Sequence, residues 1–291
     1  MLPHDTDVAA FKTRYDAIDD AYRAGTLTRA ALDAWREAQL RTVLAHVKAR
    51  SPFYGRSLAG VDPATARIAD LAALPFTTKD DLRNEMFGIM SGPINDAIFY
   101  YETTGTTGAA TPCARDKKES YASNRQLLHA YRDVIAANFP EGHKPVVAVL
   151  GPTEAHSFTD TLGAIAYELD LCVAKIWPGS PIIGFDKCLN LMRDLGVEVV
   201  ATAPGQVMTL AKEARKRGLD PRRDFKVKVF MLSGELCTPE LAENLESLWG
   251  ARVFNSLYGS QEAFVIASAT TANTLRPHLP NYLFEGVDPH T

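Results

Sequence analysis

The strongest chemical signal in the sequence is a run of six residues that contains only threonine and glycine, Thr103-Thr104-Gly105-Thr106-Thr107-Gly108. It follows a strand-like stretch at Ala97–Glu102. Glycine allows close backbone approach, and four hydroxyls with backbone N–H groups can surround phosphate oxygens. A hairpin turn is the simpler interpretation, but a turn needs fewer hydroxyls. We therefore predict a phosphate-binding loop, and not a Walker loop, because G-x-x-x-x-G-K-[ST] is absent.

Two further polar segments each follow an apolar run. The first is Ser233-Gly234-Glu235, and the second is Asn255-Ser256-Leu257-Tyr258-Gly259-Ser260-Gln261-Glu262. In open α/β sheets, ligands bind outside the carboxyl ends of strands, so these segments predict a shelf for a nucleotide. The Tyr258 ring could stack on a base, and the Glu262 carboxylate could bind Mg²⁺. Taken singly, Tyr258 could be a core aromatic residue, and Glu262 could be a solvated acid at the start of a helix. Their combination with the Thr/Gly run favours a nucleotide site.

The elements that must position these residues alternate from residue 144 onward. Short apolar runs that predict strands are Lys144–Gly151, Leu171–Trp177, Val197–Thr202, Phe225–Leu232 and Arg252–Leu257. Patterns that predict helices are Phe158–Leu169, Phe185–Leu195, Val207–Arg217 and Pro239–Trp249. Continuous apolar strands that alternate with amphipathic helices indicate a largely parallel sheet covered on both faces. The last segment, Tyr282–Thr291, predicts a strand that runs into a turn.

The first fifty residues have a different pattern, that of helix. Apolar residues between Leu27 and Arg50 recur near a 3.6-residue period until Ser51-Pro52-Phe53-Tyr54-Gly55 breaks it. Further on, in Leu74-Pro-Phe-Thr-Thr-Lys-Asp-Asp-Leu82, a threonine before Lys-Asp-Asp predicts a helix N-cap with acids in the first turn.

Composition excludes several classes of protein. Of the 291 residues, 46% are hydrophobic and 23% charged, with a net charge of -4, which is ordinary for a globular protein and gives no basic footprint for a nucleic-acid partner. No apolar run approaches the ~20 residues that span a bilayer, and the N-terminus does not have the pattern of a secretory signal. The four cysteines form no C-x-x-C pair, so we expect reduced thiols in a cytoplasmic protein without a structural zinc.

With these motifs the chain resembles the adenylate-forming superfamily, and within it most closely the phenylacetate–CoA ligases. The family's [ST]-[ST]-G-T-T-G loop matches Thr103–Gly108, and its Y-G-x-[ST]-E motif matches Tyr258–Glu262 except at Gln261. The Leu74–Leu82 segment and the Ser51–Tyr54 turn resemble features of the phenylacetate–CoA ligase branch.

The resemblance implies an α/β fold, that of the N-terminal large domain of an adenylate-forming enzyme, with mostly parallel sheets flanked by helices. Residues 1–82 would form a mainly helical entry segment, and residues 97–291 the core that binds nucleotide and acid. The family's ribose-binding aspartate and its small C-terminal lid with a catalytic lysine would lie beyond Thr291, so we expect the lid to be absent from this chain. The family pattern also differs at Ala110, Thr111 and Ser256; Asn255 could take over recognition of the base from an acid that the branch usually has at the position of Ser256.

By the same resemblance the chain would activate a carboxylic acid, with an aromatic acid expected, as an acyl adenylate at the expense of ATP, and transfer the acyl group to a thiol. Thr103–Gly108 would bind the ATP phosphates, with Thr106 and Glu262 as catalytic residues and Glu262 as the Mg²⁺ ligand. Ser233–Glu235 and Asn255–Gln261 would bind AMP, and His156, Phe158 and Gly259 would line the acyl pocket. For His156 a second interpretation stays open, in which Ser157 or Thr159 caps the next helix and His156 is only nearby.

Other interpretations stay open at this point. The acceptor thiol would be that of CoA or, alternatively, of a carrier protein, and a homodimer is left open. From a different class, the chain could be a nucleotide- and acid-binding module that is catalytically incomplete. Hydrolase and dehydrogenase functions are disfavoured because neither G-x-S-x-G nor G-x-G-x-x-G occurs.

Overall fold

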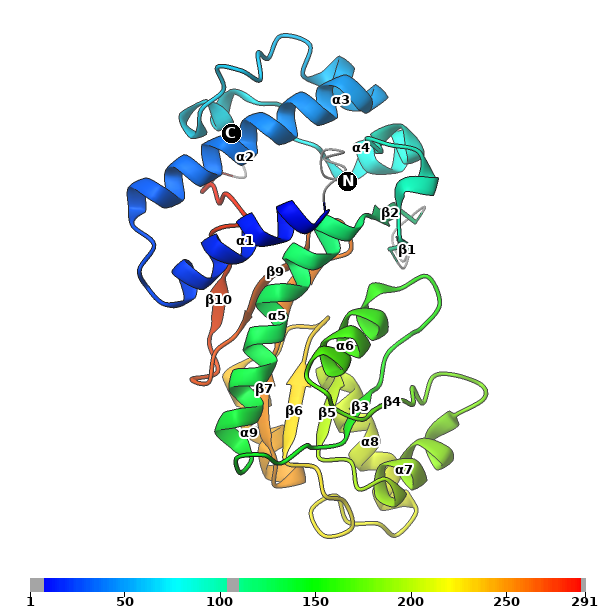
Figure 1. Ribbon diagram of the computed structural model, residues 1–291. Coiled ribbons are helices and arrows are strands. Elements are labelled where there is room, and N and C mark those ends of the chain that lie inside the picture. The colour runs from blue at the N-terminus through cyan, green and yellow to red at the C-terminus, as the bar shows by residue number, and fades with distance from the viewer. Residues whose placement is uncertain (1–7, 104–109, 289–291) are drawn as a thin grey trace. The chain divides into compact units, whose positions relative to one another are not determined.

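A computed structural model describes residues 8–103 and 110–288, and it divides into two units (Figure 1). One unit comprises residues up to Ser123 together with those from His278 onward, and the other comprises Asn124–Pro277. The helix α5 (Lys117–Asn138) carries the chain from the first unit into the second. Among the described helices, none combines the length and the apolar character needed to cross a bilayer.

The first unit is mainly helical, as the period of its apolar residues predicts. Its helices are α1 (Val8–Arg23), α2 (Arg29–Arg50), α3 (Pro52–Ser57) and α4 (Lys79–Glu85), with short 3₁₀ turns η1 (Ile68–Ala73), η2 (Met86–Ile89) and η3 (Ile94–Asp96). Thr28 caps α2 by accepting a hydrogen bond from the N–H of Ala31. The predicted cap at Thr78 is confirmed: it forms a capping box with Asp81, which satisfies two free N–H groups at the start of α4.

Two strands of the first unit flank the Thr/Gly run. β1 (Phe99–Glu102) pairs antiparallel with β2 (Pro112–Arg115), and the N–H of Thr103 donates to the carbonyl of Thr111. The predicted strand before the run is therefore confirmed. Of the run itself only Thr103 lies within the described residues, while Thr104, Gly105, Thr106, Thr107 and Gly108 lie outside them.

The strand predicted for Tyr282–Thr291 is wrong over its described part, because residues 282–288 have no regular secondary structure. The segment just before it is held instead by hydrogen bonds to two helices, α2 and α5. The Trp35 indole donates to the carbonyl of Pro280, and the Asn281 amide donates to the carbonyl of Ala122. Apolar composition predicted a strand, but the neighbours here are helices, which offer no strand edge for pairing.

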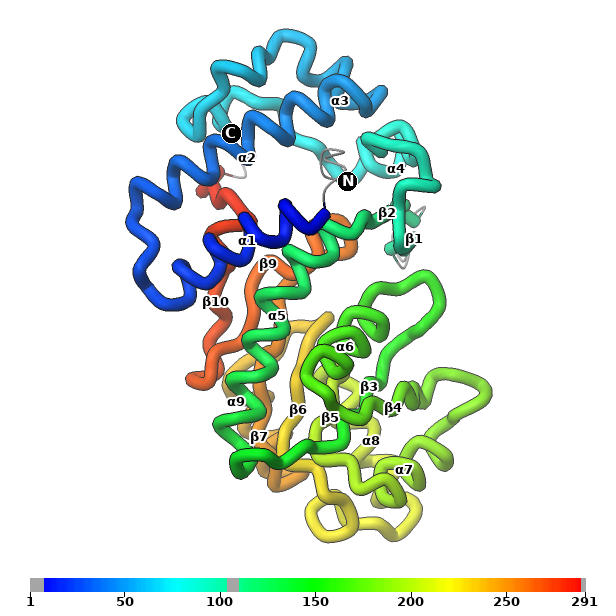
Figure 2. The backbone as a smooth tube through the Cα atoms, in the orientation of Figure 1, coloured from blue at the N-terminus to red at the C-terminus, as the bar shows by residue number. Residues whose placement is uncertain are grey.

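The second unit contains a five-stranded parallel sheet of order β4-β3-β5-β6-β7 (Figures 1 and 2). Its strands are β3 (Val147–Val149), β4 (Val173–Lys175), β5 (Val199–Thr202), β6 (Val229–Leu232) and β7 (Arg252–Asn255). Its helices are α6 (Ser157–Glu168), α7 (Gly184–Asp194), α8 (Pro204–Lys216) and α9 (Pro239–Trp249). The alternation of strands and helices predicted from the sequence is confirmed, and each element lies within a few residues of its predicted bounds.

Helices cover both faces of this sheet, which explains why its strands are apolar throughout. Alternate strand residues such as Val200 and Phe230 join the side chains of α7, α8 and α9 in one core cluster, with Trp249 packed edge-on against Phe230. The intervening residues, such as Val199 and Val229, are also buried but face the other way, toward the face on which α6 packs on β3 and β4. The strand order reverses between β3 and β5. The connections that leave the carboxyl ends of these two strands therefore run to opposite sides of the sheet.

The single strand predicted over Arg252–Leu257 is wrong, because two strands of different sheets divide it. β7 ends at Asn255, and β8 (Leu257–Ser260) belongs to an antiparallel sheet with β9 (Phe264–Ala269) and β10 (Leu275–Pro277). Ser256 lies at the break: its N–H and its hydroxyl both donate to the carbonyl of Leu232, at 2.7 and 2.9 Å. The N–H bond continues the pairing with β6, whereas the carbonyl of Ser256 accepts the N–H of Ala269 in β9, so the chain passes from the parallel sheet into the antiparallel one at this residue.

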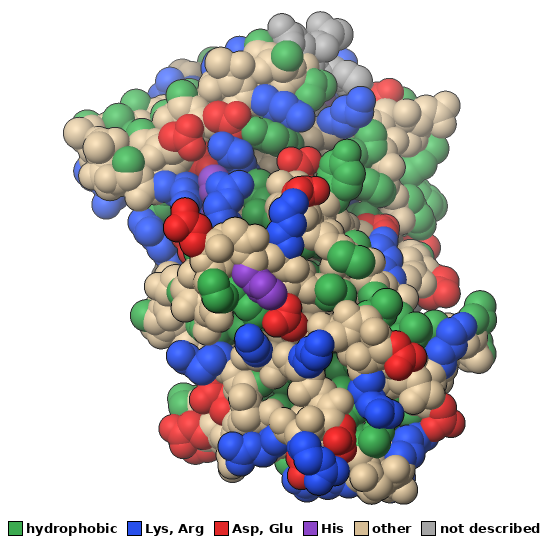
Figure 3. Space-filling model, turned by 60° about the horizontal axis from the view of Figure 1, so that its bottom comes forward, with side chains coloured by type: hydrophobic (Ala, Val, Ile, Leu, Met, Phe, Trp, Pro, Cys, Tyr) green, Lys and Arg blue, Asp and Glu red, His purple; other side chains and the backbone are tan. Residues whose placement is uncertain are grey.

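The molecular surface in the view of Figure 3 carries Lys and Arg side chains interspersed with Asp and Glu side chains. On this face the basic side chains do not gather in one continuous patch. Such a distribution fits the small net charge of -4.

Candidate functional site

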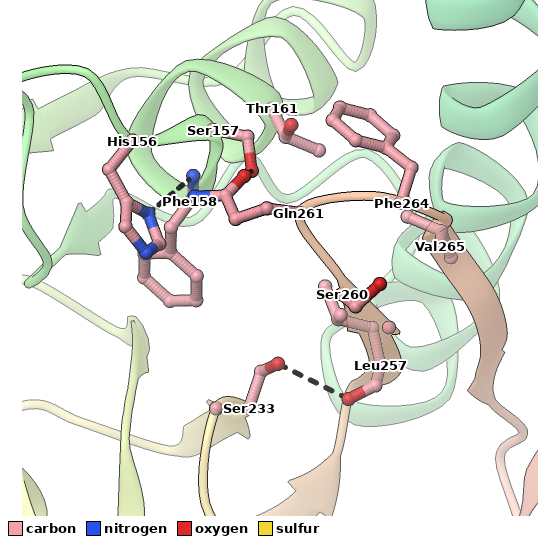
Figure 4. Close-up of a pocket in the computed structure, with 12 residues that line it drawn as sticks. His156, Ser157, Phe158, Thr161, Ser233, Leu257, Ser260, Gln261, Phe264 and Val265 are labelled. Atoms are coloured by element: carbon pink, nitrogen blue, oxygen red, sulfur yellow. Dashed lines mark hydrogen bonds between the residues drawn. The ribbon is translucent and has the colours of Figure 1, made fainter. Parts of the chain in front are cut away.

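A pocket of about 180 Å³ lies in the second unit, lined by three segments that follow strands of the parallel sheet. One segment is the start of α6, which follows β3; another is Ser233 and Gly234 after β6; the third is the β8–β9 hairpin after β7. Figure 4 shows their side chains around a common space. The prediction that polar segments after neighbouring strands meet at the carboxyl edge of the sheet is thus confirmed for the segments that begin at Ser233 and Asn255.

His156 is the residue that caps α6. The N–H of Phe158 donates to His156 Nδ1 at 3.2 Å, so the ring serves as an acceptor at the first turn of the helix. Burial lowers the pKa of His156, which favours the neutral imidazole that such an acceptor requires. The same ring lines the pocket, so the cap and the pocket wall are one side chain.

The alternative interpretation, in which Ser157 or Thr159 caps α6, is wrong. The Ser157 hydroxyl donates to Gln261 Oε1 at 2.6 Å, and the Thr159 hydroxyl donates back to the carbonyls of Gly151 and Pro152. Both hydroxyls are directed to other parts of the chain, because the imidazole already occupies the acceptor position. The Ser157–Gln261 hydrogen bond joins the start of α6 to the turn of the β8–β9 hairpin (Figure 4).

Phe158 is fixed by close approach to the end of β3. A Cβ added at Gly151 would lie 2.4 Å from the Phe158 ring, so glycine is needed there for the ring to occupy its place. The aromatic wall of the pocket therefore depends on a small residue in the preceding loop.

The β8–β9 hairpin needs glycine at position 259 for a similar reason. A Cβ at Gly259 would lie 1.9 Å from the carbonyl oxygen of Phe264, where the register shifts between Tyr258 and Gly259. Phe264 has a φ of 66°, a left-handed conformation that its packing must hold. The family motif around Tyr258-Gly259 thus forms a tight bulged hairpin rather than the loop at a strand end that the sequence suggested.

The segment after β6 is tied to its neighbours. The Ser233 hydroxyl donates to the carbonyl of Leu257 at 3.2 Å, and Gly234 has a φ of 86°. Glu235 turns away from the pocket, and its carboxylate accepts the N–H of Gly205 at 3.0 Å, in the first turn of α8. These bonds hold the segment in place across β5, β6 and β8.

The structure therefore brings part of the predicted set together. The predicted residues that line one pocket are His156, Phe158, Ser233, Gly234, Leu257, Gly259, Ser260 and Gln261. Predicted residues that do not line it are Glu235, Asn255, Ser256, Tyr258 and Glu262.

Four further side chains of the second group remain to be placed. Ser256 is 1% exposed and bonded to Leu232, whereas the Tyr258 ring is 60% exposed, as a stacking platform for a base would be. The Asn255 amide donates to the carbonyl of Cys237 at 3.4 Å. Glu262 lies in the turn between β8 and β9 and is partly buried.

Four residues that line the pocket were not predicted to do so: Ser157, Thr161, Phe264 and Val265. A signal for the first two was available, because Ser157 lies between the predicted residues His156 and Phe158, and Thr161 lies four residues after Ser157 and so on the same helix face. For Phe264 and Val265 no signal was available, since neighbouring residues of a flat strand point to opposite sides and only the bulged hairpin lets both contribute.

The pocket is neutral. Among its lining residues within the described parts of the chain there is no Lys, Arg, Asp or Glu, and the one titratable group, His156, has its pKa lowered by burial. Aromatic and aliphatic side chains alternate with hydroxyls and one carboxamide. This chemistry suits the uncharged body of an organic molecule better than a chain of phosphates.

Comparison with known proteins agrees with the sequence motifs. No family model matches the chain. The chain is 29% identical over 277 residues to a phenylacetate–coenzyme A ligase of Thermus thermophilus, covering 91% of this chain and 59% of that ligase. It is 28% identical over 257 residues to a phenylacetate–coenzyme A ligase of Pseudomonas putida, covering 84% of this chain and 55% of that ligase. The resemblance to phenylacetate–CoA ligases is confirmed by these relatives, of whose length the chain spans less than two thirds.

Among solved structures, the chain resembles 2-hydroxyisobutyryl-CoA ligase in complex with 2-HIB-AMP and CoA. The TM-score is 0.70 at 22% sequence identity, over 85% of this chain and 53% of that chain. The predicted fold, an α/β unit with a parallel sheet flanked by helices as in adenylate-forming CoA ligases, is confirmed by this match.

Proposed function

We propose that the protein takes part in ATP-dependent activation of an aromatic carboxylic acid as an acyl adenylate, followed by transfer of the acyl group to the thiol of CoA. A carboxylate oxygen would attack the α-phosphorus of ATP and expel pyrophosphate; the thiol sulfur would then attack the acyl carbon and expel AMP. Support comes from relatives named phenylacetate–coenzyme A ligases that match 91% and 84% of the chain. A carrier-protein thiol is the alternative acceptor.

The observation that carries the proposal is the hydrogen bond between the Ser157 and Gln261 side chains, 104 positions apart, in the lining of a neutral pocket. This contact brings the residue after His156 to the Tyr258–Glu262 motif that resembles the family's signature. We assign the acid's uncharged body to the space between His156, Phe158 and Gly259. The neutral lining stabilises an aromatic body by burial of apolar area, which positions the carboxylate for attack.

The nucleotide would lie on the solvent side of the same hairpin. The exposed Tyr258 ring offers a stacking face for adenine, and the backbone of Ser233-Gly234 offers polar groups beside it. We assign the β- and γ-phosphates to Thr103–Gly108, with Thr106 among the hydroxyls that would contact them. Glu235, Asn255 and Ser256 would support the AMP site by holding its loops, since their side chains are bonded to the protein.

Glu262 is the residue that we assign to Mg²⁺. Its carboxylate fits a metal that takes one or two carboxylates together with substrate phosphates, and its place in a partly buried turn leaves it accessible. When bound, Mg²⁺ would neutralise charge on the phosphates.

ATP–pyrophosphate exchange by the full-length protein, with a panel of aromatic acids, tests the proposal. We expect exchange that depends on the acid and on Mg²⁺. Glu262→Gln keeps the shape of the side chain and removes its charge, so the exchange rate should fall by at least about tenfold, or ~1.4 kcal/mol of transition-state stabilisation.

Glu243→Gln is the matched control, since Glu243 is an exposed acid on α9 that does not line the pocket. It should leave exchange unchanged. Identical Mg²⁺ dependence in Glu262→Gln and in the unsubstituted protein would end the metal-ligand assignment, and no exchange with any acid would contradict the proposed function.

A further inference from the structure

Thr161 stands out among the polar residues of the pocket. It lies on α6, one turn beyond Ser157, and lines the pocket together with the buried side chains of Phe264 and Val265. The residue is only 7% exposed. No hydrogen bond joins its hydroxyl to any residue in the described parts of the chain, 8–103 and 110–288.

Threonines elsewhere on helices show how unusual this is. The hydroxyls of Thr13, Thr42 and Thr209 each donate to the carbonyl four residues earlier, at 3.1, 2.8 and 2.9 Å. This is the bond that a helical threonine makes when nothing else is offered. Thr161 could form it with the carbonyl of Ser157 but does not, so its hydroxyl is turned to another direction.

Thr161 has surface open to the cavity, because it is one of the lining residues. Its oxygen is not sealed from solvent, unlike the Thr111 hydroxyl of the first unit, which is fully buried and has no partner within the described residues. Figure 4 shows the Thr161 side chain among those that surround the pocket. A hydroxyl that is more than nine-tenths buried and still open to a cavity is placed to meet a ligand.

The other hydroxyls of the pocket are engaged. Ser157 donates to Gln261, Ser233 donates to Leu257, and Ser260 accepts the N–H of Ala263. Thr161 is therefore the hydroxyl of this pocket that makes no hydrogen bond within the described chain, whereas the Ser260 hydroxyl, which is exposed, accepts one and can still donate to a ligand. The neighbours of Thr161 in the lining, such as Phe264 and Val265, are apolar and offer a ligand no competing polar group.

We propose that Thr161 determines the substrate class within the proposed function: it selects aromatic acids that carry a neutral hydrogen-bonding group on the ring, such as a hydroxyl, an amino group or a ring nitrogen. A hydroxyl both donates and accepts, so Thr161 serves either kind of group. A charged substituent is disfavoured, because no lining residue in the described chain carries a countercharge.

The energetics favour discrimination by such a residue. An unsubstituted ring that fills the pocket would displace water from the hydroxyl and leave it without a partner. A site built to bond a polar group rejects an analogue that lacks it more strongly than it distinguishes one methylene. We expect the substituted ligand to bind at least about tenfold more tightly when its polar group reaches Thr161.

The test is binding to the 291-residue chain, so that it does not depend on turnover. The probes are benzoyl-sulfamoyl-adenosine, which mimics an acyl adenylate, and its 2-, 3- and 4-hydroxy and amino derivatives, titrated by calorimetry. At least one derivative should bind about tenfold or more tightly than the parent. Thr161→Val has almost the same shape without the hydroxyl and should bring that ratio close to one, whereas Thr161→Ser should keep most of it.

Thr209→Val controls for loss of a helical hydroxyl, because Thr209 is exposed on α8 and does not line the pocket. It should keep the ratio of the unsubstituted protein. Equal affinity of the unsubstituted protein for parent and all derivatives, or a ratio that survives in Thr161→Val, would overturn the role of Thr161 and leave the proposed function standing. If none of the probes binds, the proposed function itself fails, and the role of Thr161 with it. Equal affinity for the parent and all derivatives is measured on the unsubstituted protein, so the proposal can be tested even if Thr161→Val does not fold.

Discussion

The two ends of the parallel sheet carry cavities of opposite character. At the carboxyl end lies the neutral pocket of about 180 Å³. At the amino end, a larger cavity of about 530 Å³ is lined by the segments that precede β3 and β4, among them His143, Lys144 and Asp170. The smaller cavity combines buried hydroxyls with aromatic walls, whereas the larger one is ringed by charged side chains.

Several charged side chains at the amino end pair with one another. His143 Nε2 lies 2.7 Å from a carboxylate oxygen of Glu198, Lys228 lies 3.7 Å from the other, and Lys144 pairs with Asp170. The Phe139 ring stacks on the His143 ring at 5.4 Å. Such pairs near the surface contribute little to stability. Cavity size is thus a poorer guide to function here than the presence of a buried group that still has a hydrogen bond to make.

Of the substitutions that test this difference between the two cavities, Gly259→Ala should have the largest effect. The new Cβ would lie 1.9 Å from the Phe264 carbonyl oxygen, so the hairpin must shift and the pocket with it. We expect a loss of at least about 2 kcal/mol in the free energy of unfolding and loss of acyl-adenylate binding. Denaturant unfolding and calorimetry measure both. Gly60→Ala, where the added Cβ meets nothing within 4 Å, should be close to neutral; a stable Gly259→Ala that binds normally would contradict the hairpin geometry.

Ser157→Ala should have the next largest effect. It removes the 2.6 Å hydrogen bond that ties the start of α6 to the turn of the β8–β9 hairpin. We expect a cost of about 1 kcal/mol in stability and a similar loss in binding of an acyl-adenylate analogue, about fivefold. Unfolding in denaturant and calorimetric titration measure the two. Unchanged affinity would mean that the hairpin keeps its place without this bond.

His156→Asn should change pH dependence more than stability at neutral pH, because asparagine also caps helices. Burial lowers the pKa of His156 below its unfolded value of about 6.5. The unfolded chain therefore binds the proton more readily, so the stabilising contribution is complete above about pH 6.5 and is lost as the pH falls toward the folded-state pKa. The melting temperature of the unsubstituted protein should fall more between about pH 7.5 and about pH 5.5 than that of the variant; parallel curves would argue against a neutral cap.

The smallest effect is expected at the other end of the sheet, for His143→Gln. The pair with Glu198 is partly exposed, and Lys228 remains nearby, so stability should change by less than about 1 kcal/mol. Ligand binding at the carboxyl end should not change. A clear loss of acyl-adenylate affinity would show that the two ends are coupled and would break the comparison.

Much of this molecule follows from local sequence. The alternation of apolar strands and amphipathic helices between residues 144 and 257 is set by residue period, and Thr78 and Thr238 mark helix starts because their hydroxyls accept N–H groups three residues later. The apolar strands also imply a sheet covered on both faces, and hence a site at its carboxyl edge. The predicted acyl residues His156, Phe158 and Gly259 lie in one pocket for that reason.

Only the tertiary structure decided which hydrogen-bond partner each polar side chain has. At the start of α6 the sequence offered Ser157 or Thr159 as the cap, whereas in the folded chain His156 is the cap and Ser157 bonds Gln261, more than 100 residues later. Ser256 joins two sheets, because its N–H donates to the end of β6 and its carbonyl accepts the N–H of Ala269 in β9. Thr161 lacks its usual helical bond and lines a cavity that three segments enclose. Hydrogen bonds between distant segments compete with local ones, and their outcome is fixed only when the chain is folded.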